Sequence, residues 1–302
     1  MRGVIEIDEA WLAAHPLPGF DTVSDKDSRG RVLVVGGAEF VPGALRLTGE
    51  AALRTGAGKL QMATVQAVAM ALGVLIPEAA MIALPSDEKG EIAAEAADVL
   101  RERFLRCDAL ILGPGMSIGE RTDQLVADLL SAPSASRTIL LDAAALTSAR
   151  YLEKLIAAHD GHVILTPHHG EMAHLSGLEV EAVKADLEGV ARDVARRFNA
   201  VILLKGQESL LAEPSGEIFV HRGGTVGLAT GGSGDVLAGI IGGLAAQGAA
   251  PLTAAGWGSW LHGRAGEVLS RQVAMAGFLA RELSPLIPRL IDDARPNRTK
   301  LR

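Results

Sequence analysis

Short continuous runs of apolar residues alternate with longer helix-like stretches along the chain as far as Leu204. The runs lie at 32–35, 60–64, 81–84, 109–112, 138–141, 163–165 and 201–204. Such runs, apolar at successive positions, are typical of strands that are covered on both faces. Amphipathic stretches between them, such as 91–105 and 180–198, predict helices. The alternation predicts an α/β fold, with a mostly parallel central sheet and helices on both faces.

The remaining segments complete one predicted domain over 1–302. Apolar residues at 209–212 and 218–220 flank Pro214, Ser215 and Gly216, which predicts a hairpin. From Gly234 onward the pattern is helical. Residues 1–25 are expected to form an extended or short helical arm, and 294–302 a flexible tail.

Composition excludes several classes of function. The net charge is −7, aromatic residues make up 3% of the chain and no basic stripe occurs, so a nucleic-acid partner is not expected. Uncharged runs at 60–77 and 236–261 are interrupted by Pro77 and by Gln247 and Pro251, which argues against membrane spans. The first residues lack the apolar core of a signal peptide, and Cys107 is the single cysteine. We therefore expect a cytoplasmic location.

The most informative segment is glycine-rich and runs from Ala229 through Gly231, Gly232, Ser233 and Gly234 to Asp235, just before an apolar helix. Glycines at a helix start let backbone amides approach a phosphate, and the positive end of the helix attracts it. A carboxylate there would repel a phosphate, unless it removes a proton from a hydroxyl that attacks the phosphate. Asp235 is therefore a candidate general base; the alternative is an ordinary helix cap.

Further loops follow predicted strands. Gly36 and Gly37 follow the run at 32–35, and Gly113 and Gly115 follow that at 109–112. Asp142 follows 138–141. Because the carboxyl ends of parallel strands share one edge of a sheet, these loops predict a common cleft.

Two polar segments follow later strands. His168 and Glu171 lie three residues apart; a histidine can hold an anion or a sugar hydroxyl, and a glutamate can orient Mg²⁺ through water. The alternative is a Thr/Glu capping arrangement around a loop. Lys205, next to Gly206, is a candidate contact for a nucleotide phosphate, or else a surface lysine. Neither a P-loop nor a Rossmann glycine pattern occurs.

In this order the segments resemble the ADP-dependent NAD(P)H-hydrate dehydratases, a branch of the ribokinase-like superfamily. The resemblance runs from about Leu17 to Pro288. It rests on DSRG (27–30), VLVVGG (32–37), PGA (42–44), GAGK (56–59), LGPG (112–115), LDAAAL (141–146), TPHHGE (166–171), LKG (204–206), ATGGSGDVLAG (229–239) and LHGRAG (261–266).

The resemblance implies a ribokinase-like fold and a repair reaction on damaged nicotinamide cofactors. ADP would donate its β-phosphoryl group to the 6-hydroxyl of the S-epimer of hydrated NADH or NADPH, with Mg²⁺ as cofactor. Loss of phosphate then gives NAD(P)H, AMP and phosphate. Phosphoryl transfer depends mainly on positioning and charge neutralisation, which suits an anion site with one base.

The resemblance also implies roles for individual residues. Ala44, Gly115, His168 and the catalytic Asp235 would contact the hydrated dinucleotide. The nucleotide site would contain Lys205, Gly206, Gln207, Glu208, Ser209 and Gly234, together with Gly231, Gly232 and Ser233 from the glycine-rich segment. Glu171 would hold Mg²⁺ through water.

Some positions depart from the family pattern, and alternatives remain. Thr225-Val226-Gly227-Leu228 replaces a common Asn-Pro-Gly-Met, Ala144 stands where a second acid is usual, and Arg281 where an acid is usual. The main alternative is an ATP-dependent kinase of a small alcohol or vitamin precursor, and a second is a non-catalytic nucleotide sensor. Relatives are often tetramers, so a homo-oligomer is expected. About twenty-five residues precede the first loop, so a separate chain is expected to supply epimerase activity.

Overall fold

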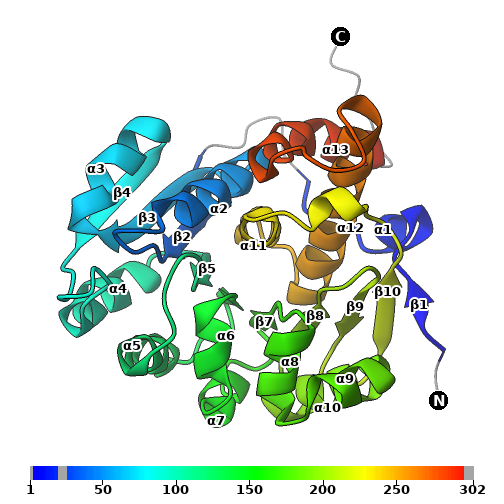
Figure 1. Cartoon of the computed structure of the whole chain (residues 1–302), viewed down its shortest axis with the longest axis horizontal. Helices are drawn as coiled ribbons and strands as arrows, with labels where there is room; N and C mark the ends of the chain where they lie inside the picture. The colour runs from blue at the N-terminus through cyan, green and yellow to red at the C-terminus, as the bar shows by residue number, and fades with distance from the viewer. Residues whose placement is uncertain (1–2, 20–25, 296–302) are drawn as a thin grey trace.

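The computed structural model describes residues 3–19 and 26–295, and its strands form one mixed sheet (Figure 1). Across the sheet the described strands follow the order β1-β10-β9-β8-β7-β6-β5-β2-β3-β4. Their bounds are β1 Ile5–Glu6, β2 Arg31–Val35, β3 Lys59–Val65, β4 Ala79–Leu84, β5 Ala109–Leu112, β6 Thr138–Leu141, β7 Val163–Leu165, β8 Val201–Leu204, β9 Ser209–Ala212 and β10 Ile218–His221. Each predicted strand is present.

The sheet is mostly parallel, as predicted. Strands β2 to β8 pair with one another only in parallel, whereas β9 runs antiparallel to both β8 and β10 and forms the predicted hairpin with β10. Strand β1 then pairs in parallel with β10. The N-terminal arm therefore adds an edge strand to the sheet, and Trp11 and Leu12 of helix α1 (Glu9–Ala14) bury their side chains in the core. Residues 1–2, 20–25 and 296–302, which include most of the predicted tail, lie outside the described residues.

Helices cover both faces of the sheet, which confirms the predicted layers (Figure 1). Val32 and Val34 of β2 belong to one core cluster, and Leu33 and Val35 to the other. The first face carries α1 Glu9–Ala14, α2 Pro42–Arg54, α3 Gln66–Leu75, α11 Ser233–Ala246, α12 Pro251–Gln272 and α13 Ile287–Ala294. The second carries α4 Ala97–Phe104, α5 Glu120–Leu130, α6 Ala144–Ala149, α7 Glu153–Ala157, α8 His169–Ser176, α9 Val180–Ala185 and α10 Leu187–Phe198.

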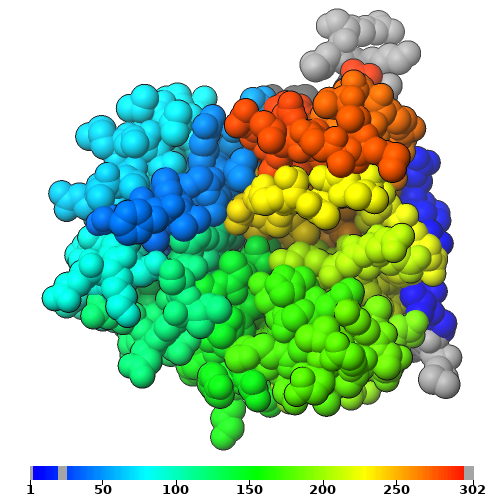
Figure 2. Space-filling view, in the orientation of Figure 1, coloured from blue at the N-terminus to red at the C-terminus, as the bar shows by residue number. Residues whose placement is uncertain are grey.

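Helix α11 is buried from Val236 to Ala246 between α2 and the sheet. Its glycines allow this close approach. A Cβ atom on Gly239 would lie 2.2 Å from the Thr48 carbonyl oxygen, and one on Gly242 would lie 2.4 Å from Ile111 Cδ1. The uncharged run at 236–261 forms most of α11 and the first half of α12, and the yellow segment at the start of α11 lies beside blue α2 in the space-filling view (Figure 2). Within the described part of the chain, no helix is both long and apolar enough to cross a membrane.

Two predicted helices are shorter than expected. Residues 91–93 are not helical, because Ile92 forms a β-bridge with Ser86, and α4 begins at Ala97. The stretch at 180–198 is divided at Asp186, whose carboxylate accepts a hydrogen bond from the Gly189 amide at 2.9 Å. A short polar side chain can cap its own backbone in this way and start a new helix.

We expect Gly239→Val to destabilise the protein by about 1–3 kcal/mol, the usual cost of overpacking a close helix contact. The Thr48 carbonyl belongs to the backbone of α2, so it cannot turn aside. The change is measured by urea denaturation. Gly43→Ala, in the first turn of α2 with open space around it, is the matched control and should keep the wild-type midpoint. An unchanged midpoint for Gly239→Val would show that α11 is not held by this contact.

Candidate active site

The loops that follow neighbouring parallel strands gather at one edge of the sheet. Along β8, β7, β6, β5 and β2, which are successive neighbours, the carboxyl ends lead to Lys205, Thr166, Asp142, Gly113 and Gly36. The predicted common site is therefore built from adjacent strands, at the edge where open α/β sheets bind ligands.

The β2 and β5 loops touch and bring Ala44 and Gly115 together. The Gly37 amide donates a hydrogen bond to the Pro114 carbonyl at 2.7 Å. Gly115 has φ +70°, and a Cβ atom there would lie 2.7 Å from the Val41 carbonyl oxygen and 3.1 Å from Ala44 Cβ. Only glycine fits this close approach, so the two residues predicted to contact the dinucleotide form one surface.

An ion pair lies at the centre of the gathered loops. Lys205 Nζ donates a hydrogen bond to Asp142 Oδ1 at 2.8 Å, and the Thr166 hydroxyl donates to the same oxygen at 2.8 Å. The Glu171 carboxylate lies 3.8 Å from Lys205 Nζ. Burial opposes the charge of the ammonium, but Asp142, Glu171 and Asp235 together raise the pKa of Lys205 above its usual value. Lys205 is therefore a stable cation here.

The N-terminus of α11 lies next to this pair. A Cβ atom built on Gly234 would lie 3.8 Å from Lys205 Nζ and 4.0 Å from Asp142 Oδ2. Gly232, at φ 87°, is the N-cap, and no side chain caps the helix. Asp235 therefore does not have the simple capping role that was its alternative interpretation.

The surroundings of Asp235, at the start of α11, suit a general base. Burial and the nearby Asp142 carboxylate raise the pKa of Asp235 to about 6, although Lys205 lowers it in part. A carboxylate with a pKa of about 6 remains ionised at pH 7 and accepts a proton better than an ordinary aspartate.

A cavity of about 920 Å³ opens between the β8–β9 loop, the segment after β10, the start of α11 and the middle of α12. Of the predicted residues, it is lined by His168, Lys205, Gly206, Gln207, Ser209, Ser233 and Gly234. Glu208, Gly231, Gly232, Asp235, Ala44 and Gly115 are not part of its lining. The structure therefore brings most of the predicted nucleotide residues into one cavity and leaves the Ala44–Gly115 surface outside it.

Two histidines in the cavity wall were not among the predicted site residues. His262 Nε2 is 2.8 Å from the Ser233 hydroxyl, and His221 Nδ1 is 3.1 Å from that of Ser259. Burial lowers the pKa of each ring to about 4, so both histidines are neutral at pH 7. His262 lies in the LHGRAG segment, which gave a signal, whereas nothing in the sequence around His221 distinguishes it.

His168 and Glu171 form a capping arrangement, but the cap is His168 and not the threonine of the alternative interpretation. His168 Nδ1 accepts from the amides of Gly170 and Glu171 at 3.0 and 3.2 Å, and Glu171 Oε2 accepts from the His168 amide at 2.8 Å. Both residues still face the site, since His168 lines the cavity and Glu171 lies near Lys205. In residues 3–19 and 26–295, no cluster of three or more metal-ligating His, Cys, Asp or Glu side chains is present. The role of Glu171 in Mg²⁺ binding stays a prediction.

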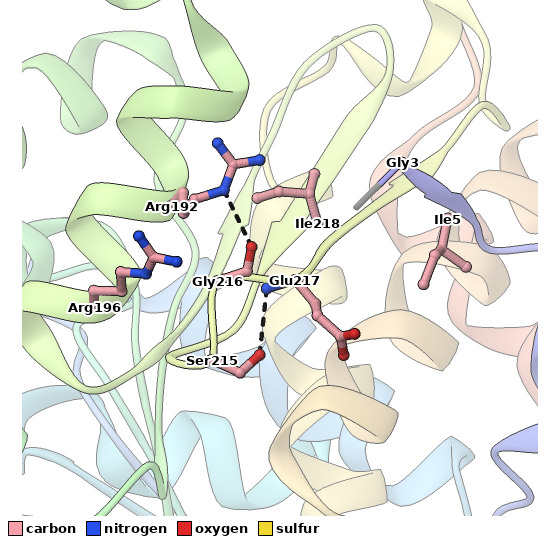
Figure 3. A pocket seen from close by; sticks show the side chains of 8 residues that line it. All are labelled: Gly3, Ile5, Arg192, Arg196, Ser215, Gly216, Glu217 and Ile218. Carbon is pink, nitrogen blue, oxygen red and sulfur yellow. Dashed lines mark hydrogen bonds between the residues drawn. The ribbon is translucent and has the colours of Figure 1, made fainter. Parts of the chain in front are cut away.

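A second cavity, of about 590 Å³, lies away from the strand ends, against the β9–β10 hairpin and α10 (Figure 3). Arg192 Nε donates to the Gly216 carbonyl at 3.1 Å, and Arg196 approaches the same turn. None of the predicted site residues lines this cavity. The predicted site residues therefore gather at the first cavity and the loops around it.

Comparison with known proteins identifies the family of this chain. A family model described as NAD(P)H-hydrate dehydratase matches residues 32–289. The chain is 44% identical over 286 residues to an ADP-dependent (S)-NAD(P)H-hydrate dehydratase from Xanthomonas campestris pv. campestris, covering 95% of this chain and 96% of that protein.

Solved structures show the same fold. The ADP/ATP-dependent NAD(P)H-hydrate dehydratase of Bacillus subtilis, co-crystallised with ATP and Mg²⁺, superposes with a TM-score of 0.79 at 28% identity, covering 97% of this chain and all of that one (100%). A ribokinase-like superfamily protein from Enterococcus faecalis V583 has a TM-score of 0.83 at 24% identity, covering 98% of each chain. The fold is thus ribokinase-like, and the chain belongs to the NAD(P)H-hydrate dehydratase family.

Proposed function

We propose that this chain is an ADP-dependent dehydratase of the S-epimer of hydrated NADH and NADPH, a hydro-lyase that repairs nicotinamide cofactors. One observation carries the proposal: Asp235 combines a raised pKa with a place at a buried helix start, beside the Lys205–Asp142 pair. A base beside a fixed cation suits the attack of a hydroxyl on a phosphate.

The reaction follows from these positions. Asp235 accepts the proton of the 6-hydroxyl while the hydroxyl oxygen attacks the β-phosphorus of ADP, and AMP leaves. The bond from C6 to the phosphorylated oxygen then breaks as phosphate leaves, a proton is lost from C5, and the C5–C6 double bond of the dihydronicotinamide is restored. Lys205 and the amides at the start of α11 stabilise the negative charge of the phosphates.

Substrates are assigned to the two parts of the site. The cavity of about 920 Å³ lies within the usual range of ligand pockets, and it would hold ADP. The hydrated dinucleotide would lie over the Ala44–Gly115 surface. Gly232 connects the two parts, because a Cβ atom there would meet Leu47 of α2 at 2.4 Å, and the first turn of α2 carries Ala44.

The charges at the centre favour a divalent cation bound with the nucleotide. Asp142, Glu171 and Asp235 supply three carboxylates around one ammonium, so a diphosphate would enter a negatively charged site. Carboxylate and phosphate oxygens are the ligands that Mg²⁺ prefers. Glu171 would hold the hydrated ion, which neutralises phosphate charge when bound. The remaining alternative is that the nucleotide is ATP, as it would be in an ATP-dependent kinase.

We also propose that the enzyme acts in the cytoplasm as a homo-oligomer, a tetramer by resemblance to the family. Interconversion of the R- and S-hydrates is assigned to a separate epimerase, because the described residues form a single sheet with one gathered set of site loops.

We expect ADP with Mg²⁺ to convert the S-hydrate of NADH into NADH, measured as the return of absorbance by reduced nicotinamide. Parallel reactions with ATP identify the preferred nucleotide, and excess EDTA should stop turnover. Activity that survives EDTA would remove the cation from the mechanism. Formation of a stable phosphate ester without NADH would instead favour the kinase.

Asp235→Asn should lower kcat by about 10²–10⁴-fold, because asparagine keeps the shape of the side chain but cannot accept the proton. ADP affinity should hold or increase, since a negative charge near the phosphates is removed. Calorimetric titration with ADP and the thermal midpoint serve as controls. A stable variant that binds ADP and keeps the wild-type kcat would exclude Asp235 as the base.

The logarithm of kcat/KM should rise with pH at low pH and level off above about pH 6. The reason is that a general base works when deprotonated, and the pKa of Asp235 is raised to about 6. Protonation below that pH removes the base. ADP affinity measured over the same pH range corrects for ionisation of the nucleotide. A corrected profile that stays flat down to pH 4 would contradict the assignment.

A further inference from the structure

Three carboxylates near the Lys205 ammonium are candidates for an ion pair with it. Asp142, Glu171 and Asp235 all raise its pKa, yet the hydrogen bond of Lys205 goes to Asp142. The Glu171 oxygen is farther away, at 3.8 Å. Asp235 acts on the same ammonium from the start of α11, where the Cβ position of the preceding Gly234 lies 3.8 Å from Lys205 Nζ. A long lysine side chain could turn to any of these carboxylates.

Asp142 is held rigidly at the end of β6. Its side chain is 4% exposed, and Oδ1 also accepts the Thr166 hydroxyl at 2.8 Å. Its amide donates to the Leu112 carbonyl at 3.1 Å, and Gly113 packs so closely that a Cβ atom there would lie 2.0 Å from the Asp142 carbonyl oxygen.

The residue after Asp142 carries backbone strain. Ala143 has φ 50° and ψ −125°, a conformation that is unfavourable for a residue with a Cβ atom. Such strain persists only where the surroundings enforce it, and it is frequent at functional sites. The turn therefore fixes the direction of the Asp142 side chain.

We propose that Asp142 is a positioning residue, which holds the Lys205 ammonium at the phosphate site and prevents it from pairing with Asp235. A direct ion pair between Lys205 and Asp235 would stabilise the carboxylate and weaken it as a base. The inference rests on the proposed function, in which Asp235 accepts the proton of the substrate.

The test is a double-mutant cycle on kcat with Asp142→Asn and Lys205→Met. Asparagine keeps the shape and an acceptor for Thr166 but loses the charge that holds the ammonium. As a single change, Asp142→Asn should lower kcat by about 10- to 100-fold. This loss approaches that expected when a general base is removed. In the Lys205→Met background the same change should lower kcat several-fold less, since no ammonium remains to be held and only the direct effect of the Asp142 charge on Asp235 is lost. Losses that multiply in the double variant would overturn the proposal.

A second variant covers the case in which Asp142→Asn does not fold. Thr166→Val keeps every charge but removes the other hydrogen bond to Asp142, so it should lower kcat less, again only while Lys205 is present. Asp123→Asn is the matched control: its carboxylate accepts the Ser148 hydroxyl at 2.6 Å on α5, outside the site, and kcat should not change. An equal loss in Asp123→Asn would mean that removing a partly buried carboxylate perturbs the fold in general.

Crystal structures separate this inference from the proposed function. In Asp142→Asn the Lys205 ammonium should be found on the Asp235 carboxylate, and a lysine that keeps its wild-type position would overturn the positioning role. That observation does not need turnover. If the wild-type protein does not convert hydrated NADH, the proposed function fails while the crystal structure still decides the role of Asp142.

Discussion

The site depends on the close contact of α11 with α2 and the sheet. The contact requires glycine where the helix crosses the Thr48 carbonyl and where it meets Ile111, because a Cβ atom would collide at both places. A helix seated this deeply has a fixed N-terminus, and that N-terminus carries Asp235. These glycines, although weak helix formers, therefore determine where the Asp235 carboxylate lies relative to the strand ends.

Burial of this helix start has an electrostatic consequence. The N-terminus of α11 and the ammonium of Lys205 attract anions, whereas Asp142, Glu171 and Asp235 repel them. Burial and Asp142 raise the pKa of Asp235, and Lys205 partly opposes this. An arrangement with more carboxylates than cations is poorly suited to a bare phosphate. It suits a phosphate that arrives with a cation, and the proposed base, Asp235, would then lie in the same cluster as the groups that bind the phosphate.

The fold could be predicted from the sequence because fully buried strands give an unmistakable apolar run, and each predicted run became a strand. The division at Asp186 was missed, because a cap inside an amphipathic pattern does not interrupt the apolar positions on either side. In the site, Asp235 and the glycines were found by their local pattern. His221 was missed, and Asp142 was noted only as a further acid, since their partners Ser259 and Lys205 are distant in the sequence. Contacts between residues that are distant in the sequence produce no local motif from which they could be predicted.

A ribokinase-like fold can support a dehydration because the protein needs to catalyse only the phosphoryl transfer. Once the 6-hydroxyl carries a phosphoryl group, the leaving group is phosphate instead of hydroxide, and the lone pair of the neighbouring ring nitrogen can expel it. A kinase of this fold acting on an ordinary alcohol would stop at the ester, because a carbon without such a nitrogen does not release phosphate readily. Whether the reaction ends at the phosphate ester or continues to loss of phosphate then depends on the substrate. This chain contributes the surface of Ala44 and Gly115 that would admit that substrate, and its phosphoryl-transfer groups are those that a kinase would also use.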